Sequence, residues 1–145
     1  MRFLTFGSGP VLALVAQVTP TPAPKGRLLI VDADPLSVRL LQATLAHEAY
    51  EIDAAGSGQA ALSKIKSQLP AVLLLELALP DMNGIDLITT LKAEPSTRDI
   101  VVIVVTSRNG HETEANVLRA GAAAYVRKPI DPIAFPELLG PKRAR

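Results

Sequence analysis

A short apolar run that ends in a single carboxylate constrains the fold of this chain more than any other stretch. The run starts at Val72 and reaches Glu76 directly after Leu75, and turn-forming residues follow at 80–84. An uninterrupted apolar run bounded by turn residues is typical of a strand buried on both faces, as in parallel sheets. We therefore expect Glu76 at the carboxyl end of a central strand, the edge of an open α/β sheet where ligands bind. It is either a functional acid or an acid solvated at a strand end.

Strand and helix patterns alternate five times after Arg27. The predicted strands are 28–31, 50–53, 72–76, 100–105 and 124–126, and the predicted helices are 35–47, 56–68, 84–93, 112–119 and a short one from 131. Strands that alternate with helices of this length imply right-handed βαβ units. The sequence thus predicts one parallel sheet covered by helices on both faces.

Local signals support the first two of these helices. Asp34 followed by Pro35 is an N-cap residue with proline at the first helical position. Apolar residues then recur three or four positions apart, which gives each helix one apolar stripe. The stripes are Val38, Leu41 and Leu45 in the first helix and Ala61, Ile65 and Leu69 in the second.

The composition excludes several classes of function. The chain has 145 residues, 48% of them hydrophobic, which suffices for one domain with one core. A formal net charge of +1 gives no field that would attract nucleic acid. The chain has no cysteine, so it forms no disulfide, and a cytoplasmic location fits. His47 and His111 are too few and too scattered for a zinc site.

The motifs of common nucleotide-binding loops are absent. The sequence has neither G-x-G-x-x-G nor G-x-x-x-x-G-K-[ST]. Gly56-Ser57-Gly58 follows a predicted strand and opens a predicted helix, so it is either an anion site or a plain turn.

Three segments make up the chain. Residues 1–26 form an N-terminal extension that carries four of the twelve prolines and an apolar run at 11–18. That run is far shorter than the roughly 18 to 20 residues of a membrane-spanning helix, and it lacks a good signal-peptide cleavage site. The repeated prolines at 19–24 predict an extended linker. Residues 27–140 form the predicted domain, and 141–145 form a short basic tail that we expect to be solvated rather than bound to DNA.

Four sequence motifs carry a resemblance to a known family. They are LIVDADP at 29–35, LLELALPDMNG at 74–84, VVTS at 104–107, and AGA at 120–122 with YVRKP at 125–129. In this order and at this spacing they resemble the receiver domain of two-component response regulators. The resemblance implies an α/β, flavodoxin-like, doubly wound sheet of five parallel strands in the order 2-1-3-4-5. It also implies a cis peptide at Lys128-Pro129 and a signalling domain rather than an enzyme.

Two of the three acids that the family uses are changed in this chain. In receivers, two adjacent acids after the first strand and an aspartate after the third hold Mg²⁺, and that aspartate accepts a phosphoryl group. By motif, Asp32 matches the first acid, Ala33 the second and Glu76 the acceptor. Ala33 offers no side-chain oxygen, and glutamate carries its carboxylate roughly 1.3 Å further out. We therefore expect weak or no Mg²⁺ binding, no other cofactor and no phosphorylation.

The remaining site residues of the family are kept. Thr106 matches the hydroxyl after the fourth strand, Tyr125 the aromatic switch position and Lys128 the lysine after the fifth strand. Glu76 either imitates the phosphorylated aspartate by accepting from Thr106 and Lys128, or it only pairs with the lysine in an inactive arrangement. Any residual metal binding would fall to Asp32 and Glu76.

One further acid belongs to the same acidic pocket. Asp34 either replaces the missing metal ligand or caps the first helix, and we predict the capping role.

Two functions of different kinds follow from the resemblance. The first is an atypical stand-alone receiver that engages a protein partner, such as a signalling protein or a histidine kinase, without phosphorylation. The alternative is a receiver that still accepts phosphate from a histidine kinase, and a small-ligand binder is a third possibility by fold analogy alone. No second domain pattern follows residue 139, so we expect output through contacts with another chain. The expected state is a monomer or weak homodimer.

The last helix is expected to be defective. Pro136 follows Pro132 by about one turn, where its ring opposes a carbonyl and removes a hydrogen bond, so the helix should be short or kinked near Phe135. A shortened helix leaves part of the sheet uncovered. We expect the apolar run at 11–18, from the same chain or a second copy, to pack there.

Overall fold

The computed structural model describes residues 26–108 and 111–139 and contains one five-stranded parallel sheet. Its strands are β1 (Gly26–Val31), β2 (Tyr50–Ala55), β3 (Val72–Leu75), β4 (Val101–Thr106) and β5 (Ala124–Arg127). All neighbouring pairs are parallel, and the order is β2-β1-β3-β4-β5. This confirms the predicted flavodoxin-like topology. The peptide Lys128-Pro129 is cis, as the resemblance implied.

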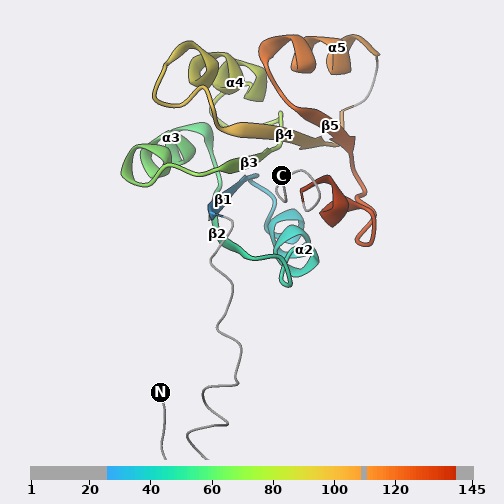
Figure 1. The fold of residues 1–145 in the computed structure, drawn as a ribbon. Helices are drawn as coiled ribbons and strands as arrows, with labels where there is room; N and C mark the ends of the chain where they lie inside the picture. The colour runs from blue at the N-terminus through green and yellow to red at the C-terminus, as the bar shows by residue number, and fades with distance from the viewer. Residues whose placement is uncertain (1–25, 109–110, 140–145) are drawn as a thin grey trace, which may run out of the picture.

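In the part of the chain that the structure describes, four α-helices and one short 3₁₀ helix connect and cover the strands. They are α2 (Pro35–Thr44), α3 (Gly58–Ser67), α4 (Gly84–Ala93), α5 (His111–Ala120) and η1 (Phe135–Leu138). Figure 1 shows α4 and α5 on one side of the sheet and α2 on the other. The prediction of α4 was correct to the residue.

The first two helices end earlier in the chain than the sequence predicted. The chain leaves α2 after Thr44 and continues as a turn, although Leu45 is still fully buried. Gln68 is extended directly after α3, with φ −147° and ψ 113°. Leu69 therefore points away from the stripe predicted for it and is 55% exposed. In both cases the apolar spacing continued past the point where the backbone left the helix.

The two faces of the sheet carry separate apolar layers. One layer packs beneath α3, α4 and α5 and includes Leu73, Leu75, Leu87 and Val117. The other packs beneath α2 and η1 and includes Leu74 of β3 and Phe135 of η1. Because β3 is buried along its whole length, it contributes alternate side chains to both layers.

Side-chain caps fix where the helices begin. Asp34 accepts a hydrogen bond from the amide of Leu36 at 3.1 Å, and it also accepts one from the hydroxyl of Ser37 at 3.0 Å. Asn83 caps α4 in the same way.

The start of α3 settles the question of an anion site at 56–58. Ser57 caps this helix, and the carboxylate of Asp81 accepts from the amides of Gly58 and Gln59 at 2.8 and 2.9 Å. The first amides of α3, which have no partner within the helix, thus donate to an acid of the same chain and are not available to an anion.

The last helix is short, as the two prolines predicted. Asp131 closes a turn by accepting from the amides of Ile133 and Ala134, and η1, the last helix among the described residues, has four residues. Within the described ranges, no helix has the length and apolar character needed to cross a membrane. The extension at 1–26, apart from Gly26, and the tail at 141–145 lie outside the described residues, so the domain boundaries stay predictions.

Candidate functional site

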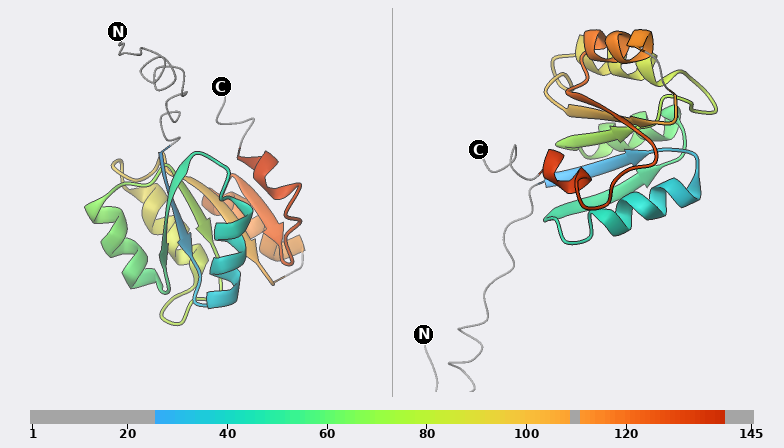
Figure 2. Two further views of the ribbon diagram at one scale, coloured as in Figure 1. Left: turned by 90° about the horizontal axis from the view of Figure 1, so that it is seen from below. Right: turned by 90° about the vertical axis from the view of Figure 1, so that its right-hand side faces the viewer.

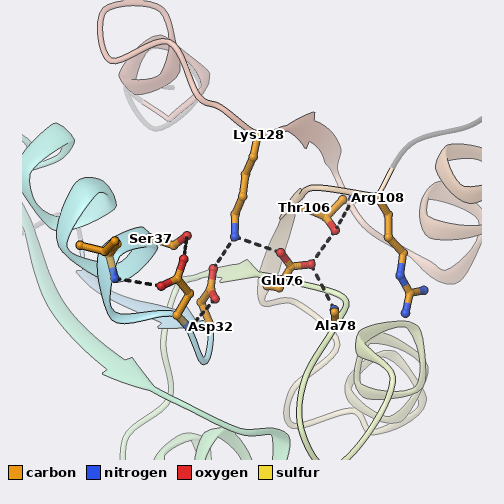
Figure 3. A network of polar contacts seen from close by, with 9 residues as sticks. Asp32, Ser37, Glu76, Ala78, Thr106, Arg108 and Lys128 are labelled. Carbon is orange, nitrogen blue, oxygen red and sulfur yellow. Dashed lines mark hydrogen bonds and ion pairs between the residues drawn. The ribbon is translucent and has the colours of Figure 1, made fainter.

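Four polar side chains meet at the carboxyl edge of the sheet. Asp32 follows β1, Glu76 follows β3, Thr106 ends β4 and Lys128 follows β5. The parallel register aligns these positions: the amide of Glu76 donates to the carbonyl of Val31 at 2.9 Å. The amide of Lys128 likewise donates to the carbonyl of Thr106 at 2.8 Å. Figure 3 shows the resulting network.

Lys128 bridges the two acids. Its ammonium nitrogen lies 2.8 Å from Oδ2 of Asp32 and 2.9 Å from Oε1 of Glu76. The carboxylates are buried, with side-chain exposures of 5% and 6%, whereas the lysine is 21% exposed. One cation is thus shared between two buried acids, and Figure 3 shows Lys128 between Asp32 and Glu76.

The other oxygen of each acid is also occupied. Oε2 of Glu76 accepts from the hydroxyl of Thr106 at 2.5 Å and from the amide of Ala78 at 3.1 Å. Oδ1 of Asp32 accepts from the amide of Asp34 at 2.9 Å. Every carboxylate oxygen of the pair therefore has a donor, which offsets the cost of burying these charges.

Hydrogen bonds keep Glu76 and Lys128 charged. Burial alone would raise the pKa of Glu76, but donors on Thr106, Ala78 and Lys128 outweigh it and hold the pKa of this carboxyl below its ordinary value. Burial alone would lower the pKa of Lys128. Its hydrogen bonds to Asp32 and Glu76 outweigh that effect and raise the pKa of the ammonium. At neutral pH the site holds a carboxylate facing an ammonium.

Asp34 does not join this cluster through its side chain. Its carboxylate turns toward the first turn of α2 and caps Leu36 and Ser37. Only its backbone amide reaches Asp32.

Tyr125 is linked to Thr106 through Arg108. Its ring is half-buried against the layer beneath α3, α4 and α5, and its hydroxyl donates to the carbonyl of Arg108 at 2.5 Å. The amide of the same Arg108 donates to the hydroxyl of Thr106 at 3.2 Å. One peptide segment after β4 thus joins the two residues.

The roles of Arg108 and Ala78 at this site were not predicted from the sequence. Both act through backbone groups, which every residue type carries, so no side-chain pattern marks them. Only the sharp turns after β3 and β4 would have pointed to these amides.

Comparison with protein-family models settles the family. The model described as "Response regulator receiver domain" matches residues 28–139. The chain belongs to this family. The family match covers the sheet, its helices and all the acids and cations of the network.

Known receivers and response regulators are similar to this receiver domain over most of its length. Response regulator PleD of Caulobacter vibrioides is 37% identical over 107 residues, which cover 74% of this chain and 24% of PleD. The DNA-binding response regulator MtrA of Mycolicibacterium smegmatis is 34% identical, with 82% of this chain and 50% of MtrA covered. The chain thus spans a quarter to a half of these two relatives.

A solved structure shares the fold. The crystal structure of a putative response regulator from Chloroflexus aurantiacus superposes with a TM-score of 0.77 at 30% identity. The match covers 84% of this chain and 99% of that one.

The Mg²⁺ of the family does not fit the residues present. Ala33 supplies no side-chain oxygen, and the ammonium of Lys128 lies within hydrogen-bond distance of both acids. Within the described part of the chain, no three or more His, Cys, Asp or Glu side chains gather closely enough to hold a metal ion. Mg²⁺ binds proteins through one or two carboxylates and several waters, whereas here the ammonium of Lys128 already occupies one oxygen of each acid.

The Thr106 hydrogen bond can be tested by stability. Thr106→Val keeps the shape of this fully buried side chain but leaves Oε2 of Glu76 with one donor instead of two. We expect the free energy of unfolding to fall by about 2 kcal/mol in urea titrations. Thr89→Val is the control, because that hydroxyl bonds a carbonyl of its own helix at an exposed position and should change stability by less than about 0.5 kcal/mol. Equal losses in both variants would contradict a special role for Thr106.

Proposed function

We propose that this receiver domain is a protein-interaction module of two-component signalling that works without a phosphorylation cycle. The observation that carries the proposal is the double engagement of Glu76. Its carboxylate accepts from Thr106 and from Lys128, the two residues that converge on a phosphoryl group in the family. A negative charge that is built into the chain then replaces one that relatives acquire by reaction.

The arrangement favours imitation of the phosphorylated state over an inert ion pair. An inert pair would leave Thr106 without a bond to Glu76 and Tyr125 turned outward. Instead Thr106 binds the carboxylate, and Tyr125 packs against the core with its hydroxyl on Arg108. The imitation is incomplete, because a carboxylate offers two acceptor oxygens where a phosphoryl group offers three.

Accepting phosphate is the competing function, and the site opposes it. Phosphoryl transfer depends on cations that neutralise the oxygens and on an acceptor aligned with the leaving group. Ala33 does not supply the carboxylate that binds the metal directly in the family. Both oxygens of Glu76 already accept hydrogen bonds.

The partner we propose is a signalling protein, such as a histidine kinase, and the location is the cytoplasm. In this role the domain is not an enzyme, since its buried acid accepts hydrogen bonds and transfers nothing.

Incubation with acetyl phosphate and Mg²⁺ tests the proposal. We expect no phosphorylated species by intact mass spectrometry, because neither the metal nor the acceptor is placed for transfer. Glu76→Gln serves as the control for any adduct elsewhere on the chain. An adduct that forms on the unchanged chain and is lost in Glu76→Gln would establish the phosphorylatable receiver instead.

A further inference from the structure

An apolar groove lies between α2 and the segment that follows β5. It has a volume of about 300 Å³ and is lined mainly by Leu40, Leu41, Val105, Pro129 and Ile130. Lys128 lies on its wall, so the groove adjoins the ionic network. Figure 2, left, looks onto this face of the sheet, with α2 and η1 in front of the strands.

In the described residues the two faces of the sheet are covered unequally. Three helices cover the opposite face of the sheet, whereas this face has α2 and the four residues of η1. Large apolar side chains consequently remain in water on the two elements that bound the groove. Leu36 is 71% exposed and Leu40 44% on α2, and Ile133 is 83% exposed between β5 and η1. Leu40 lines the groove itself, so the groove is continuous with exposed apolar surface on α2. Exposed apolar surface beside a groove indicates a place where another segment or a partner can bind.

The chain itself offers a matching apolar segment. Residues 11–18, with the sequence VLALVAQV, lie outside the described residues and contain no charge. Buried valine and leucine side chains contribute about 1.5 kcal/mol or more each, before the cost of ordering the segment.

The linker is long enough to reach. Residues 19–25 contain three prolines and join the segment to β1, which begins at Gly26. Seven residues in an extended proline-type conformation span about 22 Å. The six residues of β1 span about 20 Å from the amino edge of the sheet to the edge that holds Lys128. The segment can therefore lie along α2 over the whole length of the groove.

We propose that residues 11–18 bind in this groove and cover the apolar surface beside Lys128. The interaction is intramolecular, because tethering by a short linker gives the segment a high effective concentration at the groove. It does not depend on whether Glu76 imitates or accepts phosphate, since Glu76 is not among the residues that line the groove.

Disulfide cross-linking of the full chain tests the proposal, because the native sequence has no cysteine. Val15→Cys is combined with Ser37→Cys, which lines the groove, and the pair is oxidised at low protein concentration. The matched control combines Val15→Cys with Ser63→Cys, an exposed position on α3, over the opposite face. We expect the groove pair to form an intramolecular disulfide at least about tenfold faster than the control pair. Adding Leu12→Asp and Leu14→Asp should remove that difference, because charged side chains would not enter an apolar groove.

Each alternative result is distinct. Equal rates for the two cysteine pairs would mean that the segment visits the surface at random, which overturns the proposal. Disulfide-linked dimers in place of the intramolecular product would assign the groove to a second copy of the chain, which also overturns it. Native mass spectrometry distinguishes these products.

Discussion

Replacing Lys128 by methionine is expected to lower the free energy of unfolding by about 3 kcal/mol at neutral pH. Methionine keeps most of the apolar stem but removes the only ammonium that contacts both Asp32 and Glu76 in the described structure. Two buried carboxylates would then face each other without a cation, which costs far more than the pair itself contributes. Urea unfolding of the two proteins in the same buffer measures the difference.

An exposed ion pair of the same chain provides the control. Lys64 lies 3.0 Å from Asp53, but the two side chains are 43% and 46% exposed. Lys64→Met should therefore cost less than about 1 kcal/mol. A loss in Lys128→Met that is no larger than this would show that the buried network contributes little.

The pH dependence of the Lys128→Met loss has a definite sign. The pKa of Glu76 is lowered in the folded protein, so its contribution to stability is present above the ordinary value of 4.5 and disappears as pH falls through the folded value. The difference between wild type and Lys128→Met should therefore shrink in acid, where a protonated Glu76 no longer needs the lysine. A difference that stays constant down to pH 3, roughly one unit below the usual carboxyl range, would exclude this electrostatic origin.

Restoring the family's acids should create a phosphorylation site. In the double variant Ala33→Asp with Glu76→Asp, a carboxylate again binds the metal directly. The acceptor side chain at position 76 is one methylene shorter, which brings its carboxylate back toward the strand. We expect Mg²⁺ affinity to rise at least about tenfold and acetyl phosphate to give a phosphorylated species. Isothermal titration and intact mass measure the two properties.

The single variants separate the two causes. Ala33→Asp alone should recover Mg²⁺ binding but not transfer, and Glu76→Asp alone should recover neither. A double variant that stays inert would mean that Thr106 or Lys128 is placed differently from its family counterparts.

Most of the fold was predictable because its signals are local. The continuous apolar runs of β3 and β4 and the cap residues Asp34 and Asn83 each fix a short stretch of backbone. Helix ends were harder, because the spacing of Leu45 and Leu69 continued past the point where the chain turned.

Most side chains of the site could be predicted from the sequence, whereas its backbone contacts could not. Matching motifs identified Glu76, Thr106 and Lys128, and the structure brings them within hydrogen-bond distance. The direction of Asp34 was also expected, since an aspartate before Pro35 caps the helix that follows. The bridge of Lys128 to Asp32 was not foreseen, because it depends on how far the lysine reaches across the end of β3.

The ion pair between Lys128 and Asp32 also bears on how long the folded molecule persists. The two residues are 96 positions apart in sequence, and the pair between Lys128 and Glu76 spans 52. Contacts this distant require the intervening strands to be in register first, so we expect them to form late in folding. Interactions absent from the folding transition state act on the unfolding rate. The network should therefore set the lifetime of the folded domain and leave its speed of folding almost unchanged.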